Sequence, residues 1–171
     1  HGTGGIGLAT LLLAKMLGAQ VVVVDVVDEK LEYAKKFGAD AAVNAAKTNA
    51  AEAIRDLTGG GAQVSIEALG IPATTNASLE CLATLGRHVH VGMPAGDGEM
   101  PINMRAVYMK QLAVYGTRGM PAWKYPSLLD MINRGQVDIS PMVAREIGLA
   151  GASEELRAMH GPTAPGTAVI T

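Results

Sequence analysis

The sequence predicts an α/β protein with a doubly wound parallel sheet, in which helices cover both faces of the strands. Short valine-rich runs alternate along the chain with longer segments whose apolar residues have helical spacing. Aromatic residues make up only 4% of the 171 residues, so aliphatic side chains build the core, as is typical of strands buried on both faces. The length and the 49% hydrophobic fraction suit one globular domain over residues 1–171.

Glycines mark the ends of the first predicted helices. Residues 5–18 have helical spacing and end at Gly18, and the β-branched run QVVVVDV at residues 20–26 follows as a strand. A second helix begins with Asp28 as its N-cap and ends at Gly38. Residues 40–44 then form a short strand, and residues 49–61 form a helix with a glycine-rich exit.

The second half of the chain continues this alternation and then loosens it. We expect a strand at residues 62–70, a helix at 73–86 and a strand at 86–93. Residues 94–110 hold two prolines and are predicted to be a connection. A strand at 111–117 and a proline-opened helix at 121–135 follow. The tail is predicted to contain a strand, a short helix from Ser153 and a last strand.

The glycine-rich start, GTGGIG, matches the pattern G-x-G-x-x-G and opens the first predicted helix. In a dinucleotide-binding interpretation, Gly2 permits the sharp turn out of a strand and Gly4 lets a pyrophosphate approach the backbone. Gly7 allows the helix to pack closely, and the helix N-terminus offers N–H donors and a positive dipole end to the phosphates. A glycine-rich turn without any ligand is the plain alternative, because such turns are common.

Asp25 favours the dinucleotide interpretation. It ends the valine-rich strand about 20 residues after the glycines, where an acid that binds the adenosine ribose is expected. A carboxylate there accepts hydrogen bonds from the ribose hydroxyls and repels the 2′-phosphate of NADP, so the sequence favours NAD. The alternative is a solvated residue at a strand end, or a cap for the following helix.

Charge and cysteine content exclude several classes of function. A net charge of −2 gives no basic surface for nucleic acid, and the apolar runs are too short to cross a membrane. A single cysteine, Cys81, allows no internal disulfide and no zinc site built from cysteines of this chain. We expect a buried thiol there and a cytoplasmic protein.

The histidines and one further carboxylate are candidate site residues. His88 and His90 share one face of a strand and are interpreted as packed or hydrogen-bonded side chains rather than metal ligands, because no third ligand lies near them in the sequence. His1 is either a contact to cofactor or substrate or a simple strand-end residue. His160 is expected at a helix C-terminus. Glu67 is expected to hydrogen-bond loops near the glycine turn rather than to act as a general base.

The glycine motif requires a strand directly before its first glycine, and only His1 precedes Gly2. That strand is central in a doubly wound sheet. We therefore expect the sequence to be a fragment whose first strand has been removed.

Four blocks in order, HGTGGIGLAT, VVVVDVVDEKLEYAKKFGAD, VSIEALG and GRHVHVGMP, resemble the coenzyme-binding domain of the zinc-type medium-chain alcohol dehydrogenases. The resemblance covers essentially the whole chain. It implies a Rossmann-type domain that binds NAD in an oxidoreductase, which transfers hydride between a small alcohol and NAD to give an aldehyde or ketone. In that family the catalytic zinc is bound by a separate domain, so this chain would hold no metal ligand and no catalytic residue, and alone it would be inactive.

The resemblance also assigns roles to individual positions. The glycine motif would contact the pyrophosphate, and Asp25 and Lys30 the adenosine ribose. Residues after the third strand would border the adenine, and those after the fourth and on the fifth would line the nicotinamide end. The implied cofactor-binding residues are Gly2, Thr3, Gly4, Gly5, Ile6, Gly7, Asp25, Lys30, Ala68, Gly70, Val91, Gly92, Met93, Val114 and Tyr115. The edge strand between Gln111 and Thr117 would pair two copies into a homo-oligomer.

Three other functions stay open on the residues alone. A zinc-free quinone or enoyl reductase of the same superfamily is disfavoured by Asp25, because such relatives usually favour NADP. An S-adenosylmethionine-dependent methyltransferase also has a glycine-rich first loop and an acid after its second strand, but Gly7 and the later blocks disfavour it. A non-catalytic NAD-sensing module would need its own first strand.

Overall fold

The computed structural model describes residues 1–94, 96, 99–159 and 164–171. Helices and strands alternate along the chain, as the sequence predicts. The helices are α1 (Gly5–Met16), α2 (Asp28–Lys36), α3 (Ala50–Thr58), α4 (Pro72–Glu80), α5 (Met104–Lys110), α6 (Tyr125–Asn133) and α7 (Ala152–Ala158). The strands are β1 (Val22–Asp25), β2 (Ala41–Asn44), β3 (Ala62–Glu67), β4 (Leu82–His90), β5 (Ala113–Gly116), β6 (Val143–Ile147) and β7 (Thr167–Ile170).

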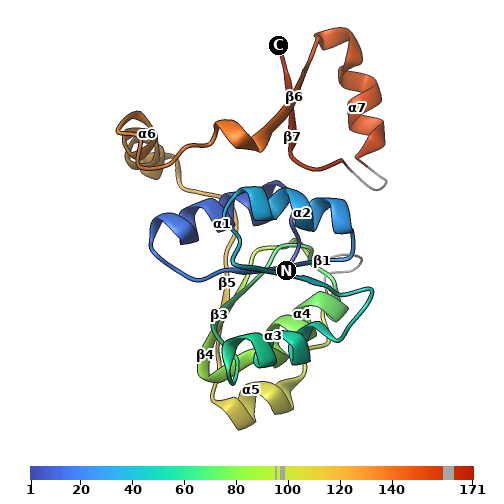
Figure 1. Ribbon diagram of the computed structural model, residues 1–171, viewed down its shortest axis with the longest axis vertical. Coiled ribbons are helices and arrows are strands. Elements are labelled where there is room, and N and C mark those ends of the chain that lie inside the picture. Colours follow the sequence, from blue (N-terminus) through green and yellow to red (C-terminus); the bar gives the residue numbers. More distant parts are fainter. Residues whose placement is uncertain (95, 97–98, 160–163) are drawn as a thin grey trace.

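The strands pair in parallel and are covered by helices on both sides. β1 pairs with β2, and β4 pairs with β3 on one side and β5 on the other, all in parallel. Figure 1 shows α1 and α2 above β1, and α3 and α4 on its other side, next to β3 and β4. Helices on both faces of parallel strands make a doubly wound α/β architecture, so the predicted fold class is confirmed.

A slot separates the two groups of strands. Among the residues that the structure describes, no ladder joins β1 to β3, and a cavity of about 770 Å³ lies between them. His1 and Gly2 bridge the slot at one end: His1 N donates to Ile66 O, Ala68 N donates to His1 O, and Gly2 N donates to Val24 O. The turn that precedes α1 is thereby fixed between β1 and β3.

The core consists of aliphatic side chains on both faces of the strands. On the α1–α2 side, Leu8, Leu11 and Leu31 pack against Val23. A second cluster on the other face contains Val24, Val43, Ala50, Ala51, Ile54 and Cys81. Val23 and Val24, which are adjacent in β1, therefore pack on opposite faces of the strand. A strand buried on both faces has apolar residues at successive positions, which explains the valine run.

Most predicted boundaries hold, and three differ. Gly18 and Gly38, with φ of +78° and +90°, follow α1 and α2 as expected of C′ glycines. The expected helix at 73–86 ends at Glu80, because Leu82 already pairs with Ala62 in the sheet. A continuous pattern of apolar residues is compatible with either element, so the boundary was not visible in the sequence.

The other two differences concern α5 and α2. The connection predicted at 94–110 contains α5, whose N-cap Asn103 accepts a hydrogen bond from Ala106 N. That asparagine was the available helix signal. The N-cap of α2 is Val27 rather than Asp28, and the Asp28 carboxylate instead accepts hydrogen bonds from Asn44 and Lys47.

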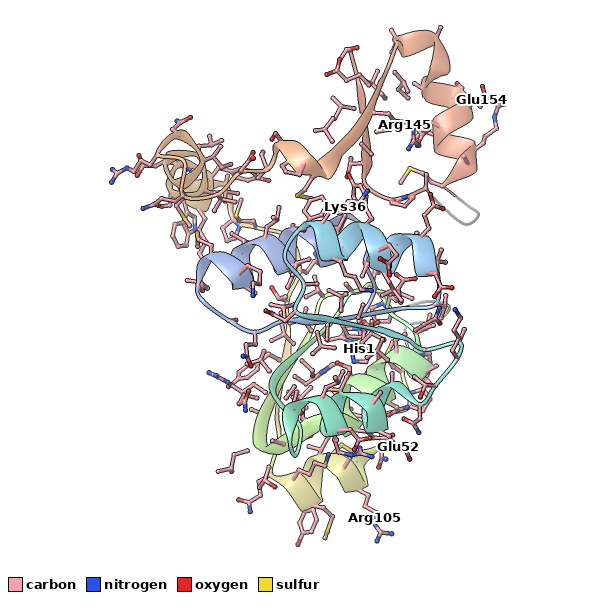
Figure 2. The ribbon with its side chains drawn as sticks, in the orientation of Figure 1. His1, Lys36, Glu52, Arg105, Arg145 and Glu154 are labelled. Atoms are coloured by element: carbon pink, nitrogen blue, oxygen red, sulfur yellow. The ribbon has the colours of Figure 1, made fainter. Side chains whose placement is uncertain are left out.

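The tail forms a small unit beside the α1–α2 layer. β6 and β7 pair in parallel with α7 next to them (Figure 1), as predicted for the strand, short helix and last strand. Arg145 of β6 lies beside α7 (Figure 2) and forms an ion pair with Glu155. Tyr33 Oη donates to Pro141 O over 2.8 Å, and Met142 packs against the α1–α2 core.

In the part of the chain that is described, no helix has the length and hydropathy needed to cross a membrane.

Candidate dinucleotide-binding edge

The predicted cofactor residues gather at one edge of the strands. β1 ends at Asp25, β3 at Glu67 and β4 at His90, and parallel strands place their carboxyl ends together. His1 and Gly2 lie between β1 and β3, so the glycine turn that follows them lies in the middle of this edge. In open α/β sheets, ligands bind at this edge.

The glycine turn has the backbone geometry that the motif requires. Gly2 has φ of +89°, which a residue with a side chain rarely adopts. A Cβ added to Gly7 would lie 1.9 Å from the carbonyl oxygen of Gly2, so only glycine lets α1 approach the turn. Gly4 is the N-cap of α1, has no side chain to cap it, and precedes a first turn without acidic residues. The N–H groups of that turn are therefore suited to an anionic ligand.

Asp25 is tied directly to the glycine turn. Its Oδ2 accepts hydrogen bonds from Thr3 N at 2.9 Å and Thr3 Oγ1 at 2.7 Å, and its Oδ1 accepts from Val26 N and Val27 N. Burial opposes ionisation of Asp25, but these hydrogen bonds outweigh it and hold the pKa below its ordinary value. The carboxylate is thus a fixed negative charge beside the glycine turn. Lys30 lies half-buried in the first turn of α2, which follows Asp25.

Glu67 connects two of the predicted cofactor loops. This fully buried carboxylate accepts hydrogen bonds from Leu69 N, Gly70 N and Thr74 Oγ1. Its backbone oxygen accepts from Val91 N and Gly92 N. The expectation that Glu67 hydrogen-bonds loops near the glycine turn is confirmed.

The two loops that Glu67 joins touch each other. A Cβ on Gly70 would lie 1.9 Å from Met93 O, and one on Gly92 would lie 2.2 Å from Gly70 N. The structure therefore brings Gly70, Gly92 and Met93 together, next to Ala68, whose N–H bonds His1. Both glycines are required by close backbone contact.

Val114 and Tyr115 lie on β5, beside β4. Val114 is in register with His88 and Tyr115 with Val89, and both side chains are about half exposed. Thr117 N donates to His90 O, which brings the end of β5 to the same edge as Val91. The residues predicted for the nicotinamide end are therefore neighbours across the sheet.

His88 and His90 are packed on one face of β4, as predicted. His88 is fully buried, with Nδ1 at 3.2 Å from Ser65 Oγ and 3.1 Å from Ser78 Oγ. Burial and the neighbouring His90 lower the pKa of His88 to about 4. The Nε2 atoms of both histidines are buried without a hydrogen-bond partner. No group of three or more His, Cys, Asp or Glu side chains among the described residues could hold a metal ion.

His1 and Cys81 face each other inside the fold. His1 lies between the two helical layers in Figure 2, and its Nε2 is 3.9 Å from Cys81 Sγ. Cys81 is a buried free thiol, as expected, and burial raises its pKa to about 11. His160, expected at a helix C-terminus, lies outside the described residues.

The sequence did not reveal how the site residues are linked. The Thr3–Asp25 hydrogen bonds span 22 positions, and the Thr74–Glu67 bond joins a helix to a strand. A threonine inside the glycine motif was the one available signal for the first link. Nothing in the sequence indicated the second.

Comparison with known proteins places the chain in a family. The family model described as zinc-binding dehydrogenase matches residues 5–134. An L-threonine 3-dehydrogenase of Saccharopolyspora erythraea is 33% identical over 144 residues, which are 83% of this chain and 41% of that protein.

Solved structures agree. Benzyl alcohol dehydrogenase from Acinetobacter calcoaceticus superposes with a TM-score of 0.87 at 25% identity, covering 99% of this chain and 48% of that one. A short chain alcohol dehydrogenase from Escherichia coli CFT073, complexed with NADH, has the same fold at 22% identity, with a TM-score of 0.85 and coverage of 99% and 50%. The chain spans about half the length of these proteins or less. It belongs to the zinc-binding dehydrogenase family.

Proposed function

We propose that this chain is the NAD-binding part, over residues 1–171, of a cytoplasmic zinc-dependent alcohol dehydrogenase. The observation that carries the proposal is the fixed Asp25 carboxylate beside an uncapped helix N-terminus. The N–H groups at Gly4, Gly5 and Ile6 suit a pyrophosphate, while Asp25 suits the two ribose hydroxyls. Its negative charge disfavours the additional phosphate of NADP.

The remaining contacts follow the edge of the sheet. Lys30 would reach the ribose from α2, and Ala68 and Gly70 would border the adenine. Residues 91–93 would hold the nicotinamide end, and Val114 and Tyr115 would offer backbone groups to its carboxamide. Packing of Gly70 against the loop at Met93 supports one continuous surface.

Bound NAD would supply the hydride acceptor, and the groups of this chain would bind and orient it. Zinc in the proposed enzyme would be bound by a separate domain, as the resemblance to zinc-type alcohol dehydrogenases implies. The substrate would be a small alcohol, oxidised to an aldehyde or ketone. The named dehydrogenase activities of the relatives support this class of reaction.

The test is a titration of the protein with NADH and NADPH, followed by nicotinamide fluorescence. We expect tighter binding of NADH, and a loss of this preference in Asp25→Ala. Asp28→Ala is the matched control, because Asp28 is also an aspartate near the start of α2 but its partners are Asn44 and Lys47. Equal binding of the two nucleotides by the unchanged protein would contradict the assignment to NAD.

We further propose that two copies pair through β5. Among the described strands β5 pairs with β4 alone, and Val114 and Tyr115 stay about half exposed on it. An open strand edge can add a strand from a second copy. Sedimentation of the protein and of Val114→Pro tests this: we expect the unchanged protein to form a dimer or larger homo-oligomer and the variant to dissociate, because proline removes a ladder N–H.

A further inference from the structure

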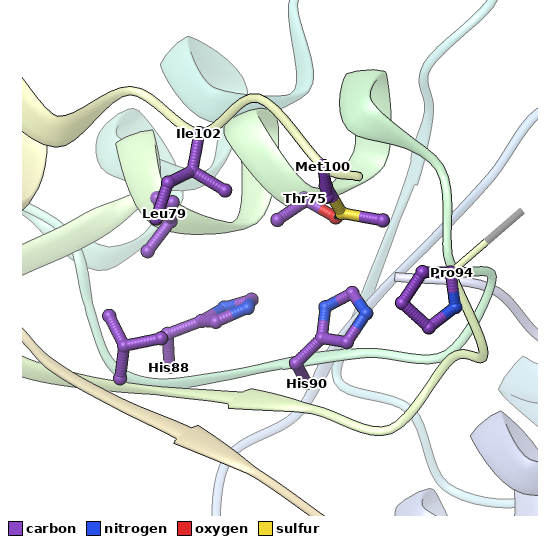
Figure 3. A pocket seen from close by; sticks show the side chains of 8 residues that line it. Thr75, Leu79, His88, His90, Pro94, Met100 and Ile102 are labelled. Atoms are coloured by element: carbon purple, nitrogen blue, oxygen red, sulfur yellow. The ribbon is translucent and has the colours of Figure 1, made fainter. Parts of the chain in front are cut away.

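A small cavity lies between β4, α4 and the chain that follows β4. Its volume is about 140 Å³, and it is lined by Thr75, Leu79, His88, His90, Pro94, Met100, Ile102 and Val114. Figure 3 shows the two histidine rings along one wall, with Met100 and Ile102 across the cavity from them. Its walls therefore come from three parts of the chain that are distant in sequence.

The polar groups around the cavity are already bonded or hidden. Thr75 Oγ1 lies 3.0 Å from Ile71 O and 2.9 Å from Met100 Sδ, so the hydroxyl and the thioether face each other. Nδ1 of His88 lies beside the hydroxyls of two serines. The Nε2 atoms of His88 and His90 are buried and add practically no accessible surface. The cavity is thus bordered almost wholly by apolar atoms.

Such a space suits an apolar molecule better than water. A buried water makes about three hydrogen bonds to protein groups, and the lining described above offers practically no free group to it. Cavities of about 150 Å³ with apolar walls stay dry and bind benzene or xenon. The volume of about 140 Å³ is therefore that of a site for one small apolar molecule.

The lining favours an aromatic ring over an aliphatic chain. The imidazole rings of His88 and His90, whose centroids are 5.9 Å apart, border the space, and aromatic rings gain from packing against one another. The thioether of Met100 lies across from them (Figure 3), and such sulfur atoms make favourable contacts with ring edges.

A ligand can enter from one side. Pro94 and Val114 are exposed, whereas Thr75, Leu79 and His88 are buried. The cavity is therefore closed towards α4 and opens between the end of β4 and β5.

We propose that this cavity is a binding site for a small uncharged aromatic molecule with a single six-membered ring, such as benzene. The ring packs between the imidazoles of β4 and the apolar side chains of α4 and of residues 100–102. A charged group on the ring is excluded from the closed part of the cavity, because it would lose its hydration without gaining a partner. The proposal does not depend on coenzyme binding.

The test is a titration of the protein with benzene, followed by the NMR signals of its methyl groups. We expect saturable shifts of the methyl signals of Leu79, Met100 and Ile102, and no shift of these signals with benzoate, which carries the same ring and a charge. Val22 and Val24 line the larger slot between β1 and β3. Benzene-induced shifts at these valines alone, or none at the three cavity residues, would overturn the proposal.

Ile102→Phe places a larger side chain in the cavity and should weaken benzene binding at least tenfold. Ile139→Phe is the matched control, because Ile139 is a half-exposed isoleucine that does not line the cavity, and it should bind benzene as the unchanged protein does. Ile102→Ala enlarges the cavity and should raise the affinity for o-xylene relative to benzene. Tight benzene binding by a folded Ile102→Phe, or an unchanged ratio of the two affinities in Ile102→Ala, would contradict the site.

Discussion

The hydroxyl of Thr3 donates a hydrogen bond to Oδ2 of Asp25 over 2.7 Å, and the backbone N–H of Thr3 bonds the same oxygen. Thr3 is buried between the first two glycines of the motif, while Asp25 ends β1. The glycine turn, proposed to bind the pyrophosphate, and the proposed ribose-binding acid are therefore one hydrogen-bonded unit. A substitution of Thr3 should therefore change how tightly Asp25 binds the ribose of the proposed coenzyme.

Replacing Thr3 with valine removes the hydroxyl and keeps the shape of the side chain. We expect Thr3→Val to weaken NADH binding roughly three- to tenfold, because Asp25 loses one hydrogen bond that orients its carboxylate. Fluorescence titration measures the change. Thr3→Ser keeps the hydroxyl and should bind NADH nearly as the unchanged protein does; an equal loss in both variants would show that packing, not the hydrogen bond, matters.

Two glycines of the motif should respond differently to alanine. In Gly7→Ala the new Cβ would meet the Gly2 carbonyl, so we expect a loss of about 1–3 kcal/mol in the free energy of unfolding. Gly4→Ala has open space around its Cβ and a negative φ of −73°, so its stability should be nearly unchanged. Urea unfolding measures both. NADH binding should weaken in Gly4→Ala, because the methyl group would stand where the pyrophosphate is proposed to approach.

Stability should depend on pH through His88. Its pKa is about 4 in the folded chain and 6.5 ordinarily, so between these values the unfolded chain binds more protons. The contribution to stability is complete above pH 6.5 and is lost as the pH falls towards 4, by up to about 1.4 kcal/mol per pH unit. Denaturant unfolding across this range should show a shallower slope for His88→Val. Identical slopes would mean that His88 titrates normally.

Glu67→Gln tests the link between the two loops that are proposed to hold the cofactor. Glutamine keeps the size of the side chain but has one oxygen to accept the bonds from Leu69, Gly70 and Thr74. We expect a loss of about 2 kcal/mol in the free energy of unfolding and faster amide exchange at Gly70. Glu80→Gln is the control, because Glu80 bonds Asn103 away from these loops. Unchanged exchange at Gly70 in Glu67→Gln would contradict the linking role.

Local patterns in the sequence predicted most of the architecture. The aliphatic runs became β1 and β3, the C′ glycines ended α1 and α2, and the glycine motif took the backbone geometry assigned to it. These features depend on spacing along the chain and on the conformations that single residues allow, so they can be read without knowing their neighbours in space.

The tertiary structure decided what depends on contacts between distant segments. The pairing of Leu82 with Ala62 ended α4 early, and Thr3 met Asp25 only because the glycine turn lies between β1 and β3. His88 and His90 could be placed on one face from their spacing, but the shared cavity with Met100 could not. Periodicity gives the direction of a side chain from its own strand, whereas its partners depend on which strands and helices the fold places beside it.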